Sequence, residues 1–390
     1  MRSDRRQRRV VESHGLARSA FSLAATFAVL AMGWAVVTAV RGGSWWGPIH
    51  AFLAGTVLLA ISGATQLFTI TWAAAPAPAR GLPATQRWLA ALGTACALIG
   101  VGVRAGRLIW LGAGLIVVSL GLLAASLLGA VRRSLLRRFD LSARFYLLAT
   151  ASGMVGVSIG AILGVGVFPE AAPSLRLVHV HLNLVGLIGI TIIGTLPTLL
   201  ATFAHHRAVS GLEAKVAWWL CLGAVTLFGA GLVAPAWVVG AGAITTSVAA
   251  LSLLSGIVWR LGRKGWRAGL PYWQVVAGVA WLIAWTAVVG SRLVAGQGLT
   301  PFTGGTAAAV TAGVGQVLLG SLAYLVPVLA GSPLGPNVTR LTARPVFPLV
   351  LANATGVALI FDWPAALGLG LLWALDFGWR LVGVRRPPPR

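Results

Sequence analysis

The sequence predicts an all-α, polytopic membrane protein with about twelve transmembrane helices, and three observations support this fold class. Apolar residues make up 58% of the 390 residues and charged residues only 9%, a balance that ordinary soluble domains do not have. Apolar runs of roughly 20 residues, enough to cross a hydrocarbon core about 30 Å thick, follow one another with little chain between them. The basic residues fall mainly between alternate runs, as is typical of membrane proteins.

The first four spans are each indicated by an apolar run with its own flanking signal. A basic cytoplasmic tail over 1–18 precedes a run over 19–40, which is longer than a signal-peptide core and lacks a clean cleavage site, so we expect an uncleaved span. The run over 48–73 follows two tryptophans suited to the membrane interface. An Ala- and Pro-rich linker over 74–87 then leads to a predicted hairpin over 88–103 and 108–130, and the arginine-rich segment after it marks the inner side.

Eight further runs complete a single transmembrane domain over 19–383, each bounded by polar, Gly-rich or Pro-rich chain. They cover 145–167, 176–204, 216–234, 236–258, 272–290, 306–330, 346–362 and 363–383. A basic, Pro-rich cytoplasmic tail is expected over 384–390.

The formal charge of +23 would suit a nucleic-acid binder, but its distribution argues against that class. If the Arg-rich start lies in the cytoplasm, the outer loops receive only five basic residues, which leaves 25 of the 30 inside. The five are Arg41, Arg104, Arg107, Arg176 and Arg292. This asymmetry follows the positive-inside rule. We therefore expect a multi-pass protein of the cell (inner) membrane, with both termini cytoplasmic, the lipid bilayer as its partner, and no nucleic acid.

A histidine–glycine pattern, H-x4-G-x7-G, occurs twice. Its copies, 131 residues apart, are His50, Gly55 and Gly63, then His181, Gly186 and Gly194. A shift of 126 residues aligns Gly194 with Gly320, but it aligns His181 with Ala307, so the third copy is degenerate. The copies fall on the second, sixth and tenth expected spans. This spacing predicts three pseudo-repeated arcs of four helices, since internal repeats are common in membrane folds.

The repeated histidines are the candidate metal ligands. Imidazole is costly in hydrocarbon and is usually retained there for a function, although a single histidine near an interface is often only a hydrogen-bonding residue. His50 and His181 enter their spans from the same side at matching depth, so together they could supply both axial ligands of a heme iron. The paired glycines would let helix backbones or a flat macrocycle approach closely. Heme b is the expected cofactor, and copper is the alternative.

Other polar residues near these spans receive separate interpretations. His179 lies about 200° around the helix from His181, so we expect it to face another cavity, a second cofactor or lipid headgroups. Arg176 and Arg41 could pair with heme propionates. The spacing of Asp376 and Arg380 predicts an ion pair within one helix. The remaining candidates are read as structural: His205 and His206 as solvated helix-end residues, Cys96 and Cys221 as small core residues.

The layout resembles the heme-copper oxidase subunit I superfamily, which has twelve helices in three arcs with histidines on helices 2 and 6. The H-x4-G-x7-G pattern is similar to that of the NnrS family, which is associated with heme, copper and the nitric oxide response. The stretch from His179 to Gly194, together with His50 to Gly55, most resembles the membrane portion of actinobacterial multicopper oxidases and copper nitrite reductases. Unlike oxidases, the chain has no histidine on its seventh or tenth span, so an oxygen-reducing copper site is not expected.

These observations predict a membrane redox protein linked to nitrogen-oxide or copper metabolism, acting in electron transfer or as an accessory protein rather than as a complete oxidase. The resemblance implies a separate cupredoxin or multicopper oxidase as redox partner. The alternative is a transporter or membrane scaffold that keeps the fold without a cofactor.

Overall fold

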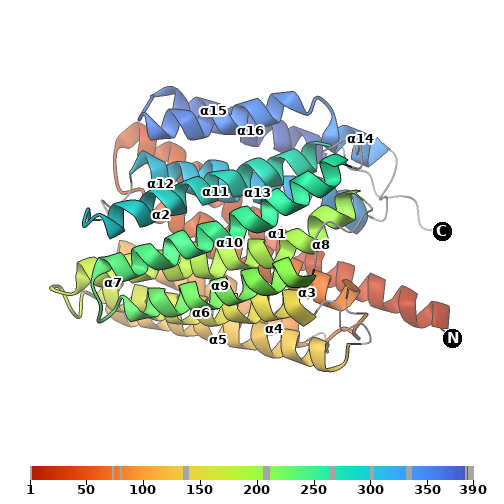
Figure 1. The fold of residues 1–390 in the computed structure, drawn as a ribbon, viewed down its shortest axis with the longest axis horizontal. Coiled ribbons are helices and arrows are strands. Elements are labelled where there is room, and N and C mark those ends of the chain that lie inside the picture. The colour runs from red at the N-terminus through yellow and green to blue at the C-terminus, as the bar shows by residue number, and fades with distance from the viewer. Residues whose placement is uncertain are drawn as a thin grey trace. The chain divides into compact units, whose positions relative to one another are not determined.

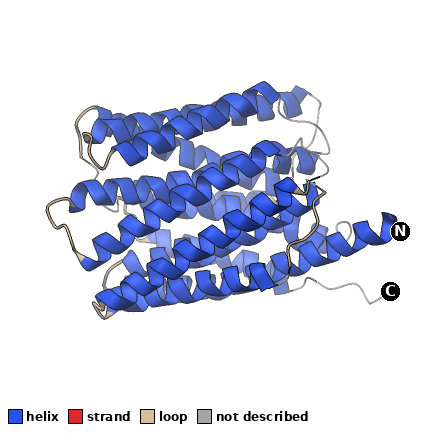
Figure 2. Ribbon diagram, turned by 90° about the horizontal axis from the view of Figure 1, so that it is seen from below, coloured by secondary structure: helices blue, strands red, loops and turns tan. Residues whose placement is uncertain are grey.

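The computed structural model describes residues 2–72, 74–79, 81–134, 140–204, 211–263, 269–298, 303–330, 336–382 and 384. Within these ranges the regular structure is entirely helical and contains no strand (Figure 2). Eleven continuous helical stretches among the described residues, some of them made of two or three consecutive labelled segments, are long and apolar enough to cross a membrane. Because a helix satisfies its own backbone hydrogen bonds, it is the element expected of such apolar segments in lipid. The all-α, multi-pass class predicted from composition is confirmed at this level.

The helices are labelled in chain order (Figure 1). The first half contains α1 (Arg2–Arg41), α2 (Trp46–His50), η1 (Ala51–Val57), α3 (Leu58–Trp72), α4 (Gly81–Gly102), α5 (Gly106–Arg132), α6 (Asp140–Val165), α7 (Ala172–Val180), η3 (His181–Gly189) and α8 (Ile190–Ala204). The second half contains α9 (Gly211–Ala230), α10 (Ala236–Arg263), α11 (Leu270–Val294), α12 (Gly304–Ala308), η4 (Ala309–Gly315), α13 (Gln316–Leu329), α14 (Pro336–Thr342), α15 (Val346–Ile360) and α16 (Ala365–Val382). Segments marked η are π-helical.

The largest differences from the expected spans are at three places. α1 begins at Arg2, so most of the predicted tail is helical, which suits arginine as a good helix former. α4 begins at Gly81, inside the predicted linker. The short helix α14 lies in what was expected to be an inner loop.

The chain divides into two compact units, and each is described by itself. The first contains Met1–Gly194 and Leu222–Gly242, and the second contains Thr195–Cys221 and Ala243–Arg390.

Glycine contacts hold the helices of the first unit together. A Cβ on Gly93 of α4 would lie 2.8 Å from the carbonyl oxygen of Gly112 on α5, so these two helices approach at backbone distance. A Cβ on Gly63 of α3 would lie 2.8 Å from the Cβ of Ala20 on α1. Such positions leave no room for a larger side chain.

The second unit combines a similar contact with polar anchors. A Cβ on Gly278 of α11 would lie 2.6 Å from the carbonyl oxygen of Gly313 in η4. Glu213 and Arg260 pair between α9 and α10. Both cysteines of the chain, Cys96 in the first unit and Cys221 in the second, are free, and Cys221 is buried.

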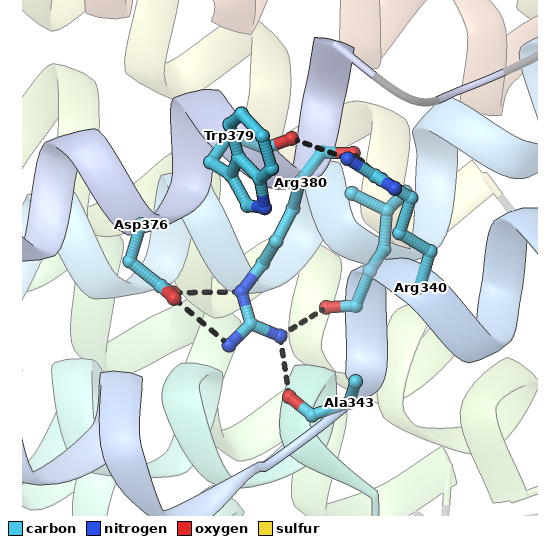
Figure 3. Close-up of polar contacts among 6 residues, drawn as sticks. Arg340, Ala343, Asp376, Trp379 and Arg380 are labelled. Carbon is cyan, nitrogen blue, oxygen red and sulfur yellow. Dashed lines mark hydrogen bonds and ion pairs between the residues drawn. The ribbon is translucent and has the colours of Figure 1, made fainter.

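Figure 3 shows how α14 is fixed to the end of α16. Arg380 forms the predicted ion pair with Asp376 at 2.7 Å, and it also donates to the backbone carbonyl of Ala343. Arg340 of α14 donates to the carbonyl oxygens of Trp379 and Arg380, at 3.0 and 3.1 Å. Arginine near a helix C-terminus commonly satisfies the last carbonyls in this way.

Candidate metal centre

The three described π-helical segments coincide with the three segments that the sequence pattern aligned. η1 follows His50, η3 begins at His181, and η4 contains Ala312, the residue that the 126-residue shift places opposite Gly186. π-helical turns are rare and frequently occur at functional sites.

In each π-helical segment, a backbone carbonyl accepts a hydrogen bond from a side chain. The carbonyl of Ala54 accepts from Thr94 at 3.0 Å, that of Leu182 from Ser152 at 2.9 Å, and that of Ala312 from Gln316 at 2.7 Å. The wider turn is therefore supported by polar contacts inside an otherwise apolar core.

The two repeated histidines have the same local geometry. The Nδ1 atom of His50 lies 2.8 Å from the carbonyl oxygen of Trp46, and that of His181 lies 2.9 Å from the carbonyl oxygen of Leu177. Both contacts join a histidine to the fourth residue before it. Because a carbonyl oxygen only accepts, each Nδ1 carries the proton, and the lone pair lies on Nε2. Metal-binding histidines usually have one ring nitrogen held in this way.

His179 is held by a neighbouring helix. Its Nδ1 atom lies 2.8 Å from the carbonyl oxygen of Gly156 on α6, and Asn183 donates to its backbone carbonyl at 2.9 Å. A Cβ on Gly160 would lie 2.6 Å from Cε1 of the ring. The glycines of α6 thus leave space for this imidazole. The Nδ2 atom of Asn183 lies farther from Nδ1, at 3.3 Å, so we assign the Nδ1 proton to the shorter contact with the carbonyl of Gly156, which leaves the lone pair on Nε2.

The structure brings His50 and His179 together. Their ring centroids are 6.3 Å apart and their planes differ by 18°. Trp46 also stacks on the His50 ring, with ring centroids 4.2 Å apart. His181 is fully buried, and its ring lies 5.3 Å from that of Phe228. The contact between His50 and His179 could not be predicted from spacing, because spacing shows which residues share a helix face but not which helix that face meets.

The repeated glycines contact neighbouring helices. A Cβ on Gly55 would lie 2.4 Å from Phe27 of α1, and one on Gly186 would lie 1.9 Å from Ser152 of α6. Gly194 lies in the same way against Phe145. Of the two roles expected for these glycines, close approach of helices is the one seen, and protein side chains fill the space beside them.

The remaining predicted site residues lie apart from these contacts. Arg41, the last residue of α1, and Arg176, one turn before His179, are both exposed. His205 and His206 lie outside the described residues.

Two imidazoles are the ligands that the site offers. Within the described part of the chain there is no group of three or more His, Cys, Asp or Glu residues that could hold a metal ion. With metal–nitrogen bonds of about 2.0–2.1 Å and a ring radius of roughly 1.1 Å, imidazoles on opposite sides of one metal have centroids roughly 6–6.5 Å apart. The observed 6.3 Å lies in this range, but the two rings are stacked. Because the lone pair of an imidazole lies in the plane of its ring, a common ion would require a ring to turn its Nε2 edge toward the other.

Comparison with family models and with curated proteins finds no match for this chain.

Proposed function

We propose that the protein is a membrane redox protein that holds one metal cofactor between His50 and His179. The observation that carries this proposal is the pairing of two imidazoles from separate spans, with each Nδ1 bonded to a backbone carbonyl and each Nε2 left to bind metal. Imidazole suits copper, iron and zinc. A structural zinc site would need four ligands, which the described residues do not supply here.

Copper fits the residues as they stand better than heme b does. Phe27 and Ser152 fill the space beside Gly55 and Gly186, where a macrocycle would have to enter. An ion between two imidazoles needs no such space. When bound, copper or heme iron supplies one-electron redox chemistry. The chain's own part is to fix both rings, through the carbonyls of Trp46 and Gly156, and to cover His50 with an indole.

In this role the protein would transfer electrons, or act as an accessory protein, in nitrogen-oxide or copper metabolism, and would not work as a complete oxidase. A separate cupredoxin or multicopper oxidase would be the partner. The exposed Arg41 and Arg176 would attract an acidic partner surface to the end of the bundle that holds the histidines. Binding to such a partner should weaken as salt is added, because exposed charges are screened.

The proposed architecture has twelve spans in three arcs of four, with both termini on the cytoplasmic side of the cell (inner) membrane. The three π-helical segments support the repeat. So do three parallel glycine contacts, in which Gly63, Gly194 and Gly320 lie against Ala20, Phe145 and Gln274 respectively. The asymmetry of basic residues supports the orientation. Accessibility of cysteines introduced into the loops tests it, and an outward-facing loop after α5 would overturn it.

The test of function is metal content and absorption of the purified protein, with His50→Ala, His179→Ala and His181→Ala beside it. His14→Ala, on α1, is the control. We expect stoichiometric copper, or a heme with a strong Soret band, that is lost in the His50 and His179 variants and kept in the control. Loss in the His50 and His181 variants alone would identify the pair expected from the sequence instead. A colourless protein without copper or iron would overturn the redox function and favour a transporter or scaffold.

A further inference from the structure

Arg87 places a cation on the buried face of α4. The residue is only 8% exposed, whereas the next residue, Trp88, is 57% exposed. Arg87 therefore faces the other helices of the first unit, while Trp88 faces outward. It lies six residues after the start of α4 at Gly81, which is about 9 Å along the helix axis. In the proposed topology this is close to the cytoplasmic boundary of the hydrocarbon.

No described residue neutralises this charge. Arg87 makes no hydrogen bond and no ion pair with any residue that the structure describes, and no carboxylate within 12–134, 140–194 and 222–242 pairs with it. The guanidinium nitrogens of Arg87 are not among the buried side-chain atoms that lack a partner, so the charged end reaches the surface while the stem packs inside. A cation held in this way, with no described protein partner, is open to an anion from outside the protein.

Polar side chains surround the level at which Arg87 lies. The contacts of Ser62 with Gln86 and of Ala54 with Thr94 fix α3 and α4 as antiparallel neighbours, and this register places Arg87 opposite the part of α3 near Ser62. Gln86 donates to Ser119 of α5 at 2.9 Å, and Gln66 donates to Ser62 at 3.2 Å. This polar layer inside an apolar bundle suits an ion better than a purely apolar contact would.

We propose that Arg87 anchors a binding site for a phosphate oxyanion at the cytoplasmic end of the first unit. The planar guanidinium matches phosphate oxygens with two parallel hydrogen bonds, which a compact ammonium group cannot do. The phosphate is either the headgroup of an anionic phospholipid or free inorganic phosphate. Both present the same chemistry to Arg87, and the test separates them. The proposal is independent of the metal centre.

The test is thermal unfolding of the full chain in lipid nanodiscs. One set contains phosphatidylcholine alone, and the other contains added phosphatidylglycerol. Each is measured with and without millimolar inorganic phosphate, with gluconate salts keeping ionic strength constant. Arg87→Gln is compared with wild type. Arg132→Gln is the matched control, because Arg132 is an exposed arginine at the end of the neighbouring helix α5.

In wild type and in Arg132→Gln, we expect the unfolding midpoint to rise by several degrees with phosphatidylglycerol or with phosphate, because a ligand that binds only the folded state stabilises it. Arg87→Gln should show no such rise. Without either ligand its midpoint should stay close to that of wild type, because Arg87 has no described protein partner to lose. A merely structural arginine would instead lower this midpoint.

A response to phosphatidylglycerol alone identifies the lipid as the source, and a response to phosphate in phosphatidylcholine identifies the free ion. The proposal is overturned if neither raises the wild-type midpoint, or if Arg87→Gln responds as wild type does. If Arg87→Gln does not fold, Arg87→Lys takes its place. Lysine keeps the charge but cannot form the two parallel hydrogen bonds of a guanidinium. The rise in the unfolding midpoint of Arg87→Lys should therefore be smaller than that of wild type, and an equal rise would also overturn the proposal.

Discussion

Replacing Gly160 with alanine should disturb the candidate metal centre without removing a ligand. The new Cβ would lie 2.6 Å from Cε1 and 2.9 Å from Nδ1 of His179. Real side chains do not tolerate such distances, so the ring must move. The obvious movement takes Nδ1 away from the carbonyl of Gly156, which it now contacts at 2.8 Å. The imidazole then loses the contact that fixes its orientation toward His50.

The magnitude follows from three terms. Overpacking by one methyl group costs about 1–3 kcal/mol, and loss of one hydrogen bond costs about 0.5–1.5 kcal/mol. The gain from replacing glycine in a helix offsets about 0.5–1 kcal/mol. The net cost is about 0.5–4 kcal/mol. If it falls on the position of the ring, metal affinity drops by up to about three powers of ten.

The assay is competition for copper against a chelator of known affinity, or heme occupancy if the bound cofactor is heme. Gly114→Ala is the control, because a Cβ at Gly114 of α5 would meet nothing within 4 Å. This variant should bind metal as wild type does and be slightly more stable. Undiminished metal affinity in Gly160→Ala would refute the argument that His179, held as described, is a ligand.

Three other predictions concern helix contacts, and unfolding in detergent measures each. Gly186→Ala should destabilise the protein by about 1–3 kcal/mol, because its Cβ would lie 1.9 Å from Oγ of Ser152. Ser152→Gly in the same chain should restore part of this loss, and an equal loss in the double variant would contradict the prediction. Asp376→Asn should lower the free energy of unfolding by about 1–3 kcal/mol, because it removes the carboxylate partner of the buried Arg380. Unchanged stability would contradict this and would mean that the backbone carbonyls alone are enough to hold Arg380. Gln86→Leu should lower the free energy of unfolding by about 1–2 kcal/mol, because it removes the hydrogen bonds of Gln86 with Ser62 of α3 and Ser119 of α5. Gln297→Leu, in an exposed loop, is the control and should cause no measurable change.

The helical class was predictable because composition leaves few alternatives. A chain so rich in apolar residues must satisfy its backbone polar groups internally, and successive long runs do so as helices. The first turns of α4 were missed for a physical reason. Gln86 and Arg87 are polar and follow an Ala- and Pro-rich stretch, which indicates a linker, yet both are buried inside the bundle. Hydropathy cannot distinguish polar residues in a loop from polar residues buried against one another.

The site was predictable only in part. His50 and His181, which the repeated spacing aligns, each bond to the carbonyl of the fourth residue before them. The partner of His50 could not be derived in this way. It depends on how the helix that contains His179 is rotated against α6, and that rotation is set by the room that Gly156 and Gly160 leave. The spacing of those two glycines marks a helix face but does not name the residue that occupies it.

The π-helical segments explain why the pattern H-x4-G repeats. His50 and Gly55 are five residues apart, as are His181 and Gly186, and in a π-helix, residues five apart are joined by one hydrogen-bonded turn. The α-helical period of 3.6 residues would therefore place the two residues of each pair on different faces of the helix, which is wrong for a π-helical turn. In the third segment the aligned positions are Ala307 and Ala312, and Ala312 lies within η4 although neither of these two positions is a histidine or a glycine. The wide turn thus does not depend on the histidine. In the proposed three-arc repeat, the turn would belong to the helix framework itself, and the histidines at the first two positions would be the additions that serve a ligand.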